Sequence, residues 1–267
     1  MSEIRFKSIN KLDGSFVLIF GGTKGIGLSV AAAALEHGAS VFVTSSQEEN
    51  VQRAITELKT TYHSSEFHHR ISGAPCDLGS SDQLEDNLRK LFELASSGLP
   101  NEKRLIDHII FTAGDTLKVV PLNDSTPASI LKSGTVRFLA PLIIGKLAAK
   151  YMRISNRSSI TLTSGSMTRR PEADWTVLAA FASGTEGMRF GLSKDLAPIR
   201  VNVVAPGVVQ TPLLARLPEQ AKENWRKTLL TGELGWPEDV AEAYIYSMKD
   251  RSATGALVDS SDGRIFN

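Results

Sequence analysis

Short apolar runs alternate with longer stretches of mixed polar and apolar residues along this 267-residue chain. The polar and apolar stretches that separate the runs, such as "SDQLEDNLRKLFELA", have the pattern of amphipathic helices. Strands that alternate with helices form a parallel sheet covered on both faces. We therefore predict one α/β domain over residues 1–267, with about seven strands. The expected strands are 15–20, 40–44, 68–78, 105–114, 158–164, 199–207 and 256–260.

The segment 176–202 is expected to begin with a long helix that packs closely against a neighbour. Its length and its place between two strands favour a helix, although Gly184, Gly187 and Gly191 are poor helix formers. Glycines along one side of a helix indicate that another backbone or helix packs closely there, and Pro198 is expected to end the helix. The stretch 96–104 reads as a loose surface insertion.

Composition and charge narrow the class of protein. Thirty basic and 29 acidic residues nearly cancel, which argues against a nucleic-acid or anionic-membrane partner. Cys76 is the single cysteine, so no internal disulfide can form, which fits a reducing compartment. The polar start does not resemble a signal peptide, and no apolar run approaches the roughly 20 residues of a membrane helix. We expect a cytoplasmic protein.

The stretch "FGGTKGIG" (20–27) carries the first candidate chemistry. It follows an apolar strand and opens a helix, where glycines permit positive φ angles and close backbone approach. The amide groups at the start of that helix would present partial positive charge to a pyrophosphate. This context predicts a Rossmann-like, doubly wound dinucleotide fold.

Further motifs resemble those of the short-chain dehydrogenase/reductase (SDR) family over nearly the whole chain. The glycine turn fits its motif with Phe20 in place of threonine, Asp77–Leu78 fits its adenine-side pair, and "FTAG" (111–114) keeps its Ala-Gly. Pro206–Gly207 fits the family's pair after the sixth strand. The resemblance implies a cofactor site at Gly21, Thr23, Lys24, Gly25, Ile26, Gly27, Ser45, Ser46, Asp77, Leu78, Ala113, Gly114, Pro206, Gly207, Val209 and Thr211.

The end of the second strand bears on the choice of dinucleotide. NAD sites usually place an acidic residue there, but this chain reads Thr44-Ser45-Ser46 and has no carboxylate before Glu48. Lys24 could pair with a 2′-phosphate, or could be an ordinary surface lysine. We predict NADP(H).

The family's Asn-Ser-Tyr-Lys tetrad is missing at its expected positions. Counting back from "LAPIRVN" puts Leu178 at the tyrosine position and Ala182 at the lysine position. Arg137 falls at the asparagine position, and Gly165, with a serine on either side, at that of the serine. None of the four tyrosines has a lysine four residues later. The usual alcohol/ketone mechanism is therefore unsupported.

A substrate that is already a cation would not need this proton relay. Hydride transfer to an iminium ion leaves a neutral amine, whereas reduction of a ketone makes an alkoxide that needs a donor. Such a site calls for a carboxylate and an aromatic face near the cation. "RRPEADW" offers Glu172, Asp174 and Trp175 just before the 176–202 helix.

This segment resembles the Pro-Asp-Pro-Gly-Trp motif of tyrosine-less SDR reductases from fungal bridged indole alkaloid biosynthesis. Those enzymes reduce a cyclic iminium species with NADPH and then shape an intramolecular Diels–Alder reaction. The resemblance implies that Arg137 orients the substrate, Glu172 holds its cationic part and Trp175 stacks on it. Here Glu172 replaces the aspartate and Pro-Gly is lost. Residues 208–236 are expected to form a substrate lid.

Several alternatives stay open at this stage. The protein could be a ketone or enone reductase that uses Arg137, or Ser164 and Ser166 through water, as its proton source. It could be a cofactor-assisted isomerase or cyclase, or a silent NADPH-binding protein. Arg137 and Glu172 could form a structural ion pair, Trp175 could be packing, and Asp174 could cap the following helix. We expect a small-molecule substrate, no metal, and a homodimer or homotetramer built on the 176–202 helix.

Overall fold

The computed structural model describes residues 7–97, 104–114 and 119–267, so most of the expected insertion at 96–104 lies outside the described residues. Within this range the strands form one parallel sheet in the order β3-β2-β1-β4-β5-β6-β7. The order reverses between β1 and β4, which is where doubly wound sheets bind their ligands. The strands are β1 (Phe16–Phe20), β2 (Ser40–Ser45), β3 (Ile71–Pro75), β4 (His108–Phe111), β5 (Ser159–Thr163), β6 (Arg200–Pro206) and β7 (Leu257–Ser260).

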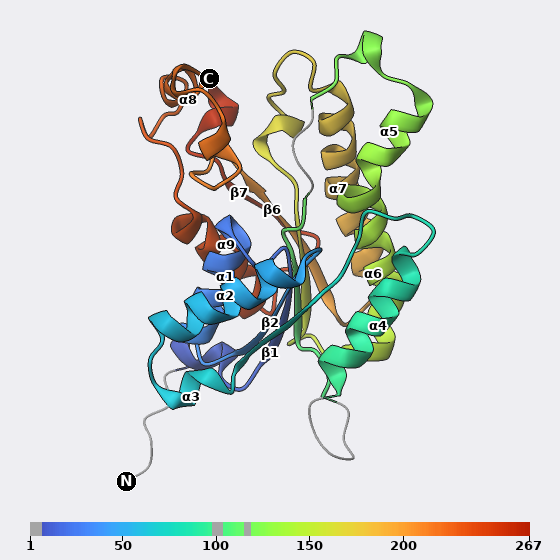
Figure 1. The fold of residues 1–267 in the computed structure, drawn as a ribbon, viewed down its shortest axis with the longest axis vertical. Helices are drawn as coiled ribbons and strands as arrows, with labels where there is room; N and C mark the ends of the chain where they lie inside the picture. The colour runs from blue at the N-terminus through green and yellow to red at the C-terminus, as the bar shows by residue number, and fades with distance from the viewer. Residues whose placement is uncertain (1–6, 98–103, 115–118) are drawn as a thin grey trace.

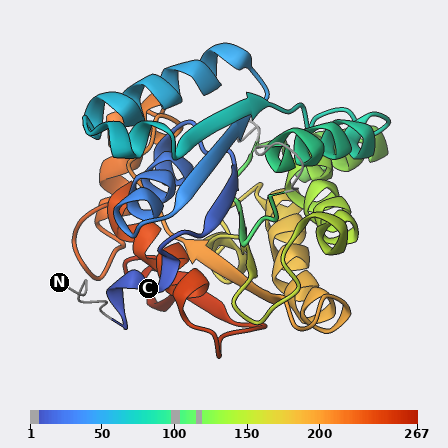
Figure 2. The ribbon, with the colours of Figure 1, turned by 90° about the horizontal axis from the view of Figure 1, so that it is seen from below.

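Helices cover both faces of the sheet (Figures 1 and 2). The helices α1 (Gly25–Glu36), α2 (Glu48–Thr61) and α9 (Pro237–Lys249) pack on one face. The helices α4 (Leu84–Ser96), α6 (Ala140–Tyr151) and α7 (Thr176–Asp195) pack on the other. Because both faces are covered, every residue of β1 and β6 is buried, as expected for central parallel strands. Shorter helices are α3 (Ser65–His68), α5 (Pro127–Gly134) and α8 (Glu219–Arg226).

The helical run that ends at Tyr151 consists of three consecutive pieces. A π-helical segment, η3 (Thr135–Leu139), joins α5 to α6. The run from 127 to 151 is long and apolar enough to cross a membrane by length and composition. Its α6 part, however, buries Ala140, Ile144 and Ala148 completely against the sheet. The α6 part is therefore a core helix of this domain.

Helix α7 differs in two ways from the sequence expectation. It ends at Asp195, three residues before Pro198. A Cβ atom on Gly184 would lie 2.7 Å from the ring of Phe138, so the expected close approach exists there. Gly187 and Gly191 have no heavy atom within 4 Å of a built Cβ, so no part of the described chain packs on them.

Candidate active site

The turn between β1 and α1 has the geometry of a dinucleotide cradle. Gly21 and Gly25 have φ values of +78° and +52°, a region that L side chains rarely adopt. A Cβ on Gly21 would lie 2.7 Å from the backbone nitrogen of Ala113, and one on Gly27 would collide with the carbonyl oxygen of Gly21. The N-cap residue Lys24 makes no side-chain cap, which leaves the first amides of α1 open to an anion.

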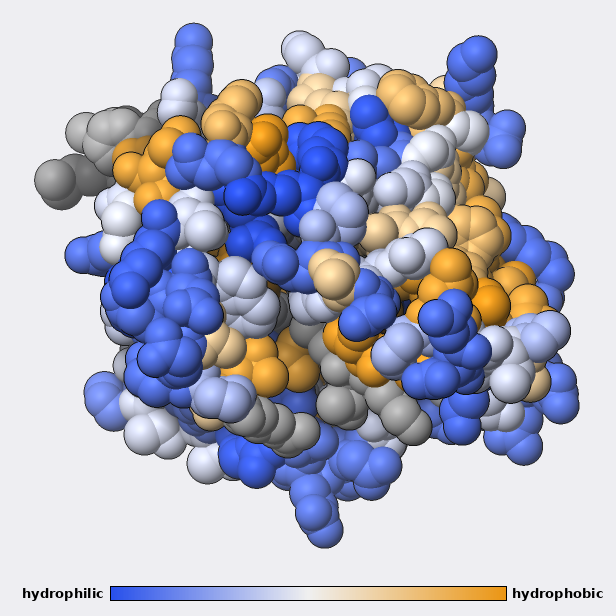
Figure 3. Space-filling view, turned by 90° about the horizontal axis from the view of Figure 1, so that it is seen from above, coloured by the Kyte–Doolittle hydropathy of each residue, from blue (hydrophilic) through white to orange (hydrophobic). Residues whose placement is uncertain are grey.

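The other expected cofactor residues follow the carboxyl ends of β2, β3, β4 and β6 and so gather at one edge of the sheet. Figure 1 shows this edge at the top, with α8 on one side and α5 on the other. In Figure 3, which looks onto it from above, polar and apolar side chains are interspersed. Thr211 approaches the glycine turn, since a Cβ on Gly25 would lie 2.9 Å from its methyl group. The geometry fits a bound dinucleotide.

The residues expected next to the adenine and ribose differ in their exposure to solvent. Ser45 ends β2 half-buried, Ser46 and Lys24 are exposed, and none of them is a carboxylate. Asp77 is exposed, and its side chain accepts a hydrogen bond from the amide of Gly79 at 2.8 Å. Leu78 is buried in the core cluster, with 6% of its surface exposed.

A pocket of about 460 Å³, partly open to solvent, lies where the tetrad would be. Its wall includes three of the expected tetrad positions, Arg137, Leu178 and Ala182. Ser164, the residue directly after β5, also lines it, whereas the expected Gly165 does not. The sequence register was thus one residue off at this point, and a serine is kept in the pocket. The lining residues are Phe111, Thr112, Ala113, Arg137, Thr163, Ser164, Met167, Leu178, Ala182 and Thr185.

Each side-chain hydroxyl that lines this pocket gives its hydrogen to another part of the protein. A serine or threonine hydroxyl has a single hydrogen to donate. None of these hydroxyls can therefore donate to a ligand without breaking an internal bond. The bonds run from Thr112 to the Phe20 carbonyl (2.9 Å), from Thr163 to the Phe111 carbonyl (2.6 Å), from Ser164 to the Glu186 carboxylate (2.9 Å) and from Thr185 to the Phe181 carbonyl (3.1 Å).

Arg137 stands in the π-helical segment η3 and reaches the pocket from there. π-Helical turns inside helices often occur at functional sites. Its guanidinium lies against Gly114, because a Cβ there would be 2.6–2.7 Å from its Nη2, Cζ and Nη1 atoms. The hydroxyl of Thr185 also lies 3.2 Å from the Arg137 carbonyl, so its single hydrogen is shared between this carbonyl and that of Phe181, and the contact places this segment against α7. Gly114, expected at the cofactor, thus also makes room for Arg137.

Tyr244 is the one tyrosine within hydrogen-bond reach of a lining residue in the described chain. Its hydroxyl lies 2.7 Å from Thr163 Oγ1, behind the pocket wall. Burial raises the pKa of Tyr244 well above its usual value, so the phenol is a weaker acid than a free tyrosine. It is fully enclosed, with 0% of its surface exposed, and is not a substitute for the missing tyrosine.

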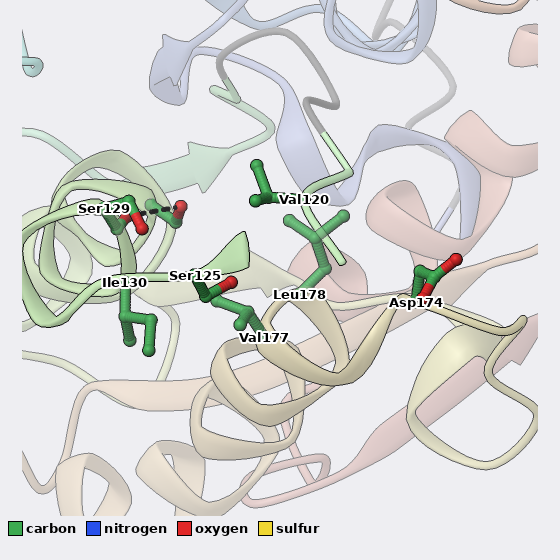
Figure 4. A pocket seen from close by; sticks show the side chains of 8 residues that line it. Val120, Ser125, Ser129, Ile130, Asp174, Val177 and Leu178 are labelled. Atoms are coloured by element: carbon green, nitrogen blue, oxygen red, sulfur yellow. Dashed lines mark hydrogen bonds between the residues drawn. The ribbon is translucent and has the colours of Figure 1, made fainter. Parts of the chain in front are cut away.

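A second pocket, of about 280 Å³, adjoins the first across Leu178, which lines both. Figure 4 shows Leu178 pointing from the first turn of α7 toward Val120, with Asp174 on its far side from Ser125 and Ser129. Asp174 has a φ of +66°, and the N-cap residue of α7 is Trp175. The expectation that Asp174 caps this helix is therefore wrong.

Glu172 has partners that the sequence did not suggest. Its carboxylate forms an ion pair with Arg264 and accepts a hydrogen bond from Trp225 Nε1 at 3.2 Å. The bonded Arg264 guanidinium holds the pKa of Glu172 below its usual value. Arg264 is the observed partner, so the alternative of an Arg137–Glu172 pair is wrong. Glu172 lines neither of the two pockets.

Trp175 and the expected lid lie around this ion pair. Trp175 is half-buried, lines neither pocket, and its amide donates to the Glu172 carbonyl at 3.3 Å. In the 208–236 segment, Leu214, Leu229 and Leu234 form a small apolar cluster of their own. Whether the segment closes over a substrate remains a prediction.

Two features of the site escaped the sequence reasoning. Glu186 lies eight residues after Leu178, two i+4 steps along the same face of α7, and this spacing could have drawn attention to it. Arg264 is distant in sequence and carried no such signal. Within the described residues, no group of three or more His, Cys, Asp or Glu side chains is placed to hold a metal ion.

Comparison with known proteins agrees with this geometry. The family model described as "SDR-like rossmann domain" matches residues 8–267. The short-chain dehydrogenase/reductases fsr5 of Gibberella fujikuroi and malC of Malbranchea aurantiaca are each 40% identical to this chain. The fsr5 match covers 98% of both chains, and the malC match 97% of both.

Solved structures agree as well. The MalC reductase/Diels–Alderase of Malbranchea aurantiaca superposes with a TM-score of 0.89 at 39% identity, covering 99% of this chain and 100% of that one. The angucycline C-6 ketoreductase LanV, solved with bound NADP, shares the fold at 23% identity and a TM-score of 0.85, covering 97% and 98% of the two chains. With the glycine cradle, the sheet order and these relatives together, the chain belongs to the short-chain dehydrogenase/reductase family of oxidoreductases.

Proposed function

We propose that this protein is an NADPH-dependent reductase of an activated C=N bond, an iminium ion or protonated imine, in fungal secondary metabolism. The observation that carries the proposal is the pocket around Leu178 and Ala182. Each of its four hydroxyls donates its hydrogen to another group of the protein and not into the pocket. An alkoxide formed from a ketone would lack a hydroxyl proton donor there, whereas an amine formed from an iminium ion needs none.

The residues would share the work as follows. A nicotinamide bound at this edge of the sheet would supply the hydride for the iminium carbon, and the C=N electron pair would pass to nitrogen. Arg137, over Gly114, would orient a carbonyl or other acceptor group of the substrate. Glu172, assigned to the substrate by resemblance, would have to leave Arg264 to reach it. Trp175, assigned in the same way, lines neither pocket. We therefore give Glu172 a role in holding the surrounding segments.

NADP(H) is the cofactor we propose. The end of β2 offers the hydroxyls of Ser45 and Ser46 and no carboxylate, which removes the repulsion that a 2′-phosphate meets in NAD sites. Lys24, exposed at the start of α1, would pair with that phosphate. Replacing Lys24 with alanine should weaken NADPH binding and leave NADH binding nearly unchanged.

A following cyclisation is a second candidate function, favoured by the two pockets that meet at Leu178. The relative MalC is a reductase/Diels–Alderase. Two adjoining pockets could fold a reduced product for a pericyclic step, which depends on shape more than on acid–base groups.

We also propose a cytoplasmic homodimer or homotetramer that uses the open face of α7 around Gly187 and Gly191.

The deciding experiment incubates the purified protein with NADPH and a panel of cyclic imines and ketones, and follows NADPH oxidation and product formation. Turnover of imines with little turnover of ketones is the expected result. Turnover of ketones alone would favour the ketone-reductase alternative. If NADPH binds but is not oxidised with any substrate, the protein is not a reductase, and the remaining alternatives are the isomerase or cyclase and the silent NADPH-binding protein.

A further inference from the structure

Glu186 has no role in the functions considered so far, and it lies directly behind the wall of the first pocket, bonded to the lining residue Ser164. It lies half-buried on α7, two i+4 steps beyond Leu178 and one beyond Ala182. Its Oε1 atom accepts hydrogen bonds from Ser164 Oγ at 2.9 Å and from Thr168 Oγ1 at 2.8 Å. The helix that lost its tyrosine and lysine thus keeps a carboxylate behind the serine that faces the pocket.

The bond between Ser164 and Glu186 fixes the polarity that Ser164 presents to a ligand. An ionised carboxylate can only accept hydrogen bonds, so the single Ser164 hydrogen points at Glu186. The Ser164 oxygen that lines the pocket then has only lone pairs to offer. Such an oxygen attracts an N–H group or a positive charge and offers nothing to a carbonyl oxygen.

We propose that Glu186 is a positioning residue that turns Ser164 into a hydrogen-bond acceptor, and that this selects an N–H iminium ion over a ketone. This inference rests on the proposed function and names the residue pair that sets its substrate class. Ser164 would touch the substrate nitrogen through its oxygen, and Glu186 would act through Ser164. No proton leaves either residue during the hydride transfer.

The test uses 3,4-dihydroisoquinoline in its protonated form and 1-tetralone, a ketone of the same bicyclic size, with the full-length protein and NADPH. Glu186→Met removes the acceptor and frees the Ser164 hydrogen. We expect the ratio of kcat/KM for imine to that for ketone to fall about tenfold, in line with a hydrogen bond to a charged group. Ser164→Ala should lower the ratio similarly.

Three further variants separate this role from general damage. In the double variant Ser164→Ala/Glu186→Met, the ratio should equal that of Ser164→Ala alone, because Glu186 acts through Ser164. Glu186→Gln keeps an acceptor oxygen and should stay close to the wild-type ratio. Thr168→Val breaks the other bond to Glu186, and because Thr168 does not line the pocket the ratio should stay unchanged. The Kd for NADPH should remain the same in all of them.

A binding measurement gives an answer that does not depend on turnover. Protonated tetrahydroisoquinoline, titrated into the complex with NADP⁺ by calorimetry, should bind about tenfold more weakly to Glu186→Met than to the wild type. An unchanged imine-to-ketone ratio and an unchanged Kd in Glu186→Met would overturn the inference while leaving the proposed reduction intact. A wild-type protein that reduces neither probe and does not bind the amine would overturn both.

Discussion

The guanidinium of Arg264 pairs with the carboxylate of Glu172 across 92 positions of sequence, and this pair joins three segments of the protein. Arg264 belongs to the C-terminal end of the chain, and its side chain is only 6% exposed. Glu172 lies between β5 and α7, and Trp225 of α8 donates to the same carboxylate oxygen. The pair therefore fastens the 208–236 segment and the C-terminus to the rim of the site.

Replacing Glu172 with glutamine should destabilise this rim. The change leaves the buried Arg264 charge without its partner, and because Glu172 is itself 44% exposed we expect a loss of about 1–2 kcal/mol. Hydrogen exchange should rise in residues 208–236 and 261–267, and the Tm should fall by several degrees. Glu219→Gln, which breaks an exposed pair with Lys222, is the matched control and should change neither. Equal exchange in both variants would show that the pair fastens nothing.

Adding a methyl group at Gly114 should move Arg137 without unfolding the protein. A Cβ at this position would meet the end of the Arg137 side chain at 2.6–2.7 Å, and a flexible side chain can swing away. We expect Gly114→Ala to keep its Tm within about 2 °C and to lose turnover nearly as strongly as Arg137→Ala. Arg137→Ala should keep NADPH affinity close to that of the wild type, whereas Gly114 itself belongs to the expected cofactor site. Strong loss of NADPH binding in Arg137→Ala would mean that Arg137 serves the cofactor.

The buried histidine of β4 predicts a pH dependence of stability. His108 is enclosed, its Nδ1 lies 2.8 Å from Ser159 Oγ, and burial lowers the pKa of His108 to about 4. The unfolded chain therefore binds more protons than the folded one between about pH 6.5 and pH 4. This contribution is complete above pH 6.5 and is lost as the pH falls toward 4, on the order of 3 kcal/mol in all.

Urea unfolding between pH 7 and pH 4.5 checks this contribution by comparing the wild type with His108→Asn. The variant should be less stable at pH 7, because it leaves a gap in the core, yet lose less stability on acidification. The same loss in both proteins would show that His108 does not carry the pH dependence.

The single thiol should be inert in the folded protein. Cys76 is buried, with 6% of its surface exposed, and burial raises the pKa of Cys76 to about 12. Since the thiolate is the reactive form, a colorimetric thiol reagent at pH 8 should label the native protein hardly at all within minutes. In strong denaturant it should label one thiol per chain. Rapid stoichiometric labelling of the native protein would contradict the burial.

The fold could be predicted from the amino-acid sequence alone, as could the glycine turn at the edge where we propose that the cofactor binds. The apolar runs placed each of the seven strands to within a few residues. The signal was clearest for the inner strands, which are buried on both faces and therefore mostly apolar, whereas the edge strands β3 and β7 are partly exposed. The glycine turn and the motifs that follow several strands could be predicted to share one site, since parallel strands bring their carboxyl ends to one edge of the sheet. Counting back from "LAPIRVN" was enough to show that Leu178 and Ala182 stand where the family has tyrosine and lysine.

Which polar groups meet was settled only by the packing of the folded chain. In the folded chain Glu172 pairs with Arg264. Ser164 lines the pocket and Gly165 does not, and Glu186 lies behind that serine. The packing also turned the middle of a long helix into the π-helical segment that carries Arg137. Sequence periodicity reports which face of an element is buried, but ion pairs and hydroxyl orientations depend on distances between elements. Those distances are set only when the sheet, its helices and the C-terminus pack together.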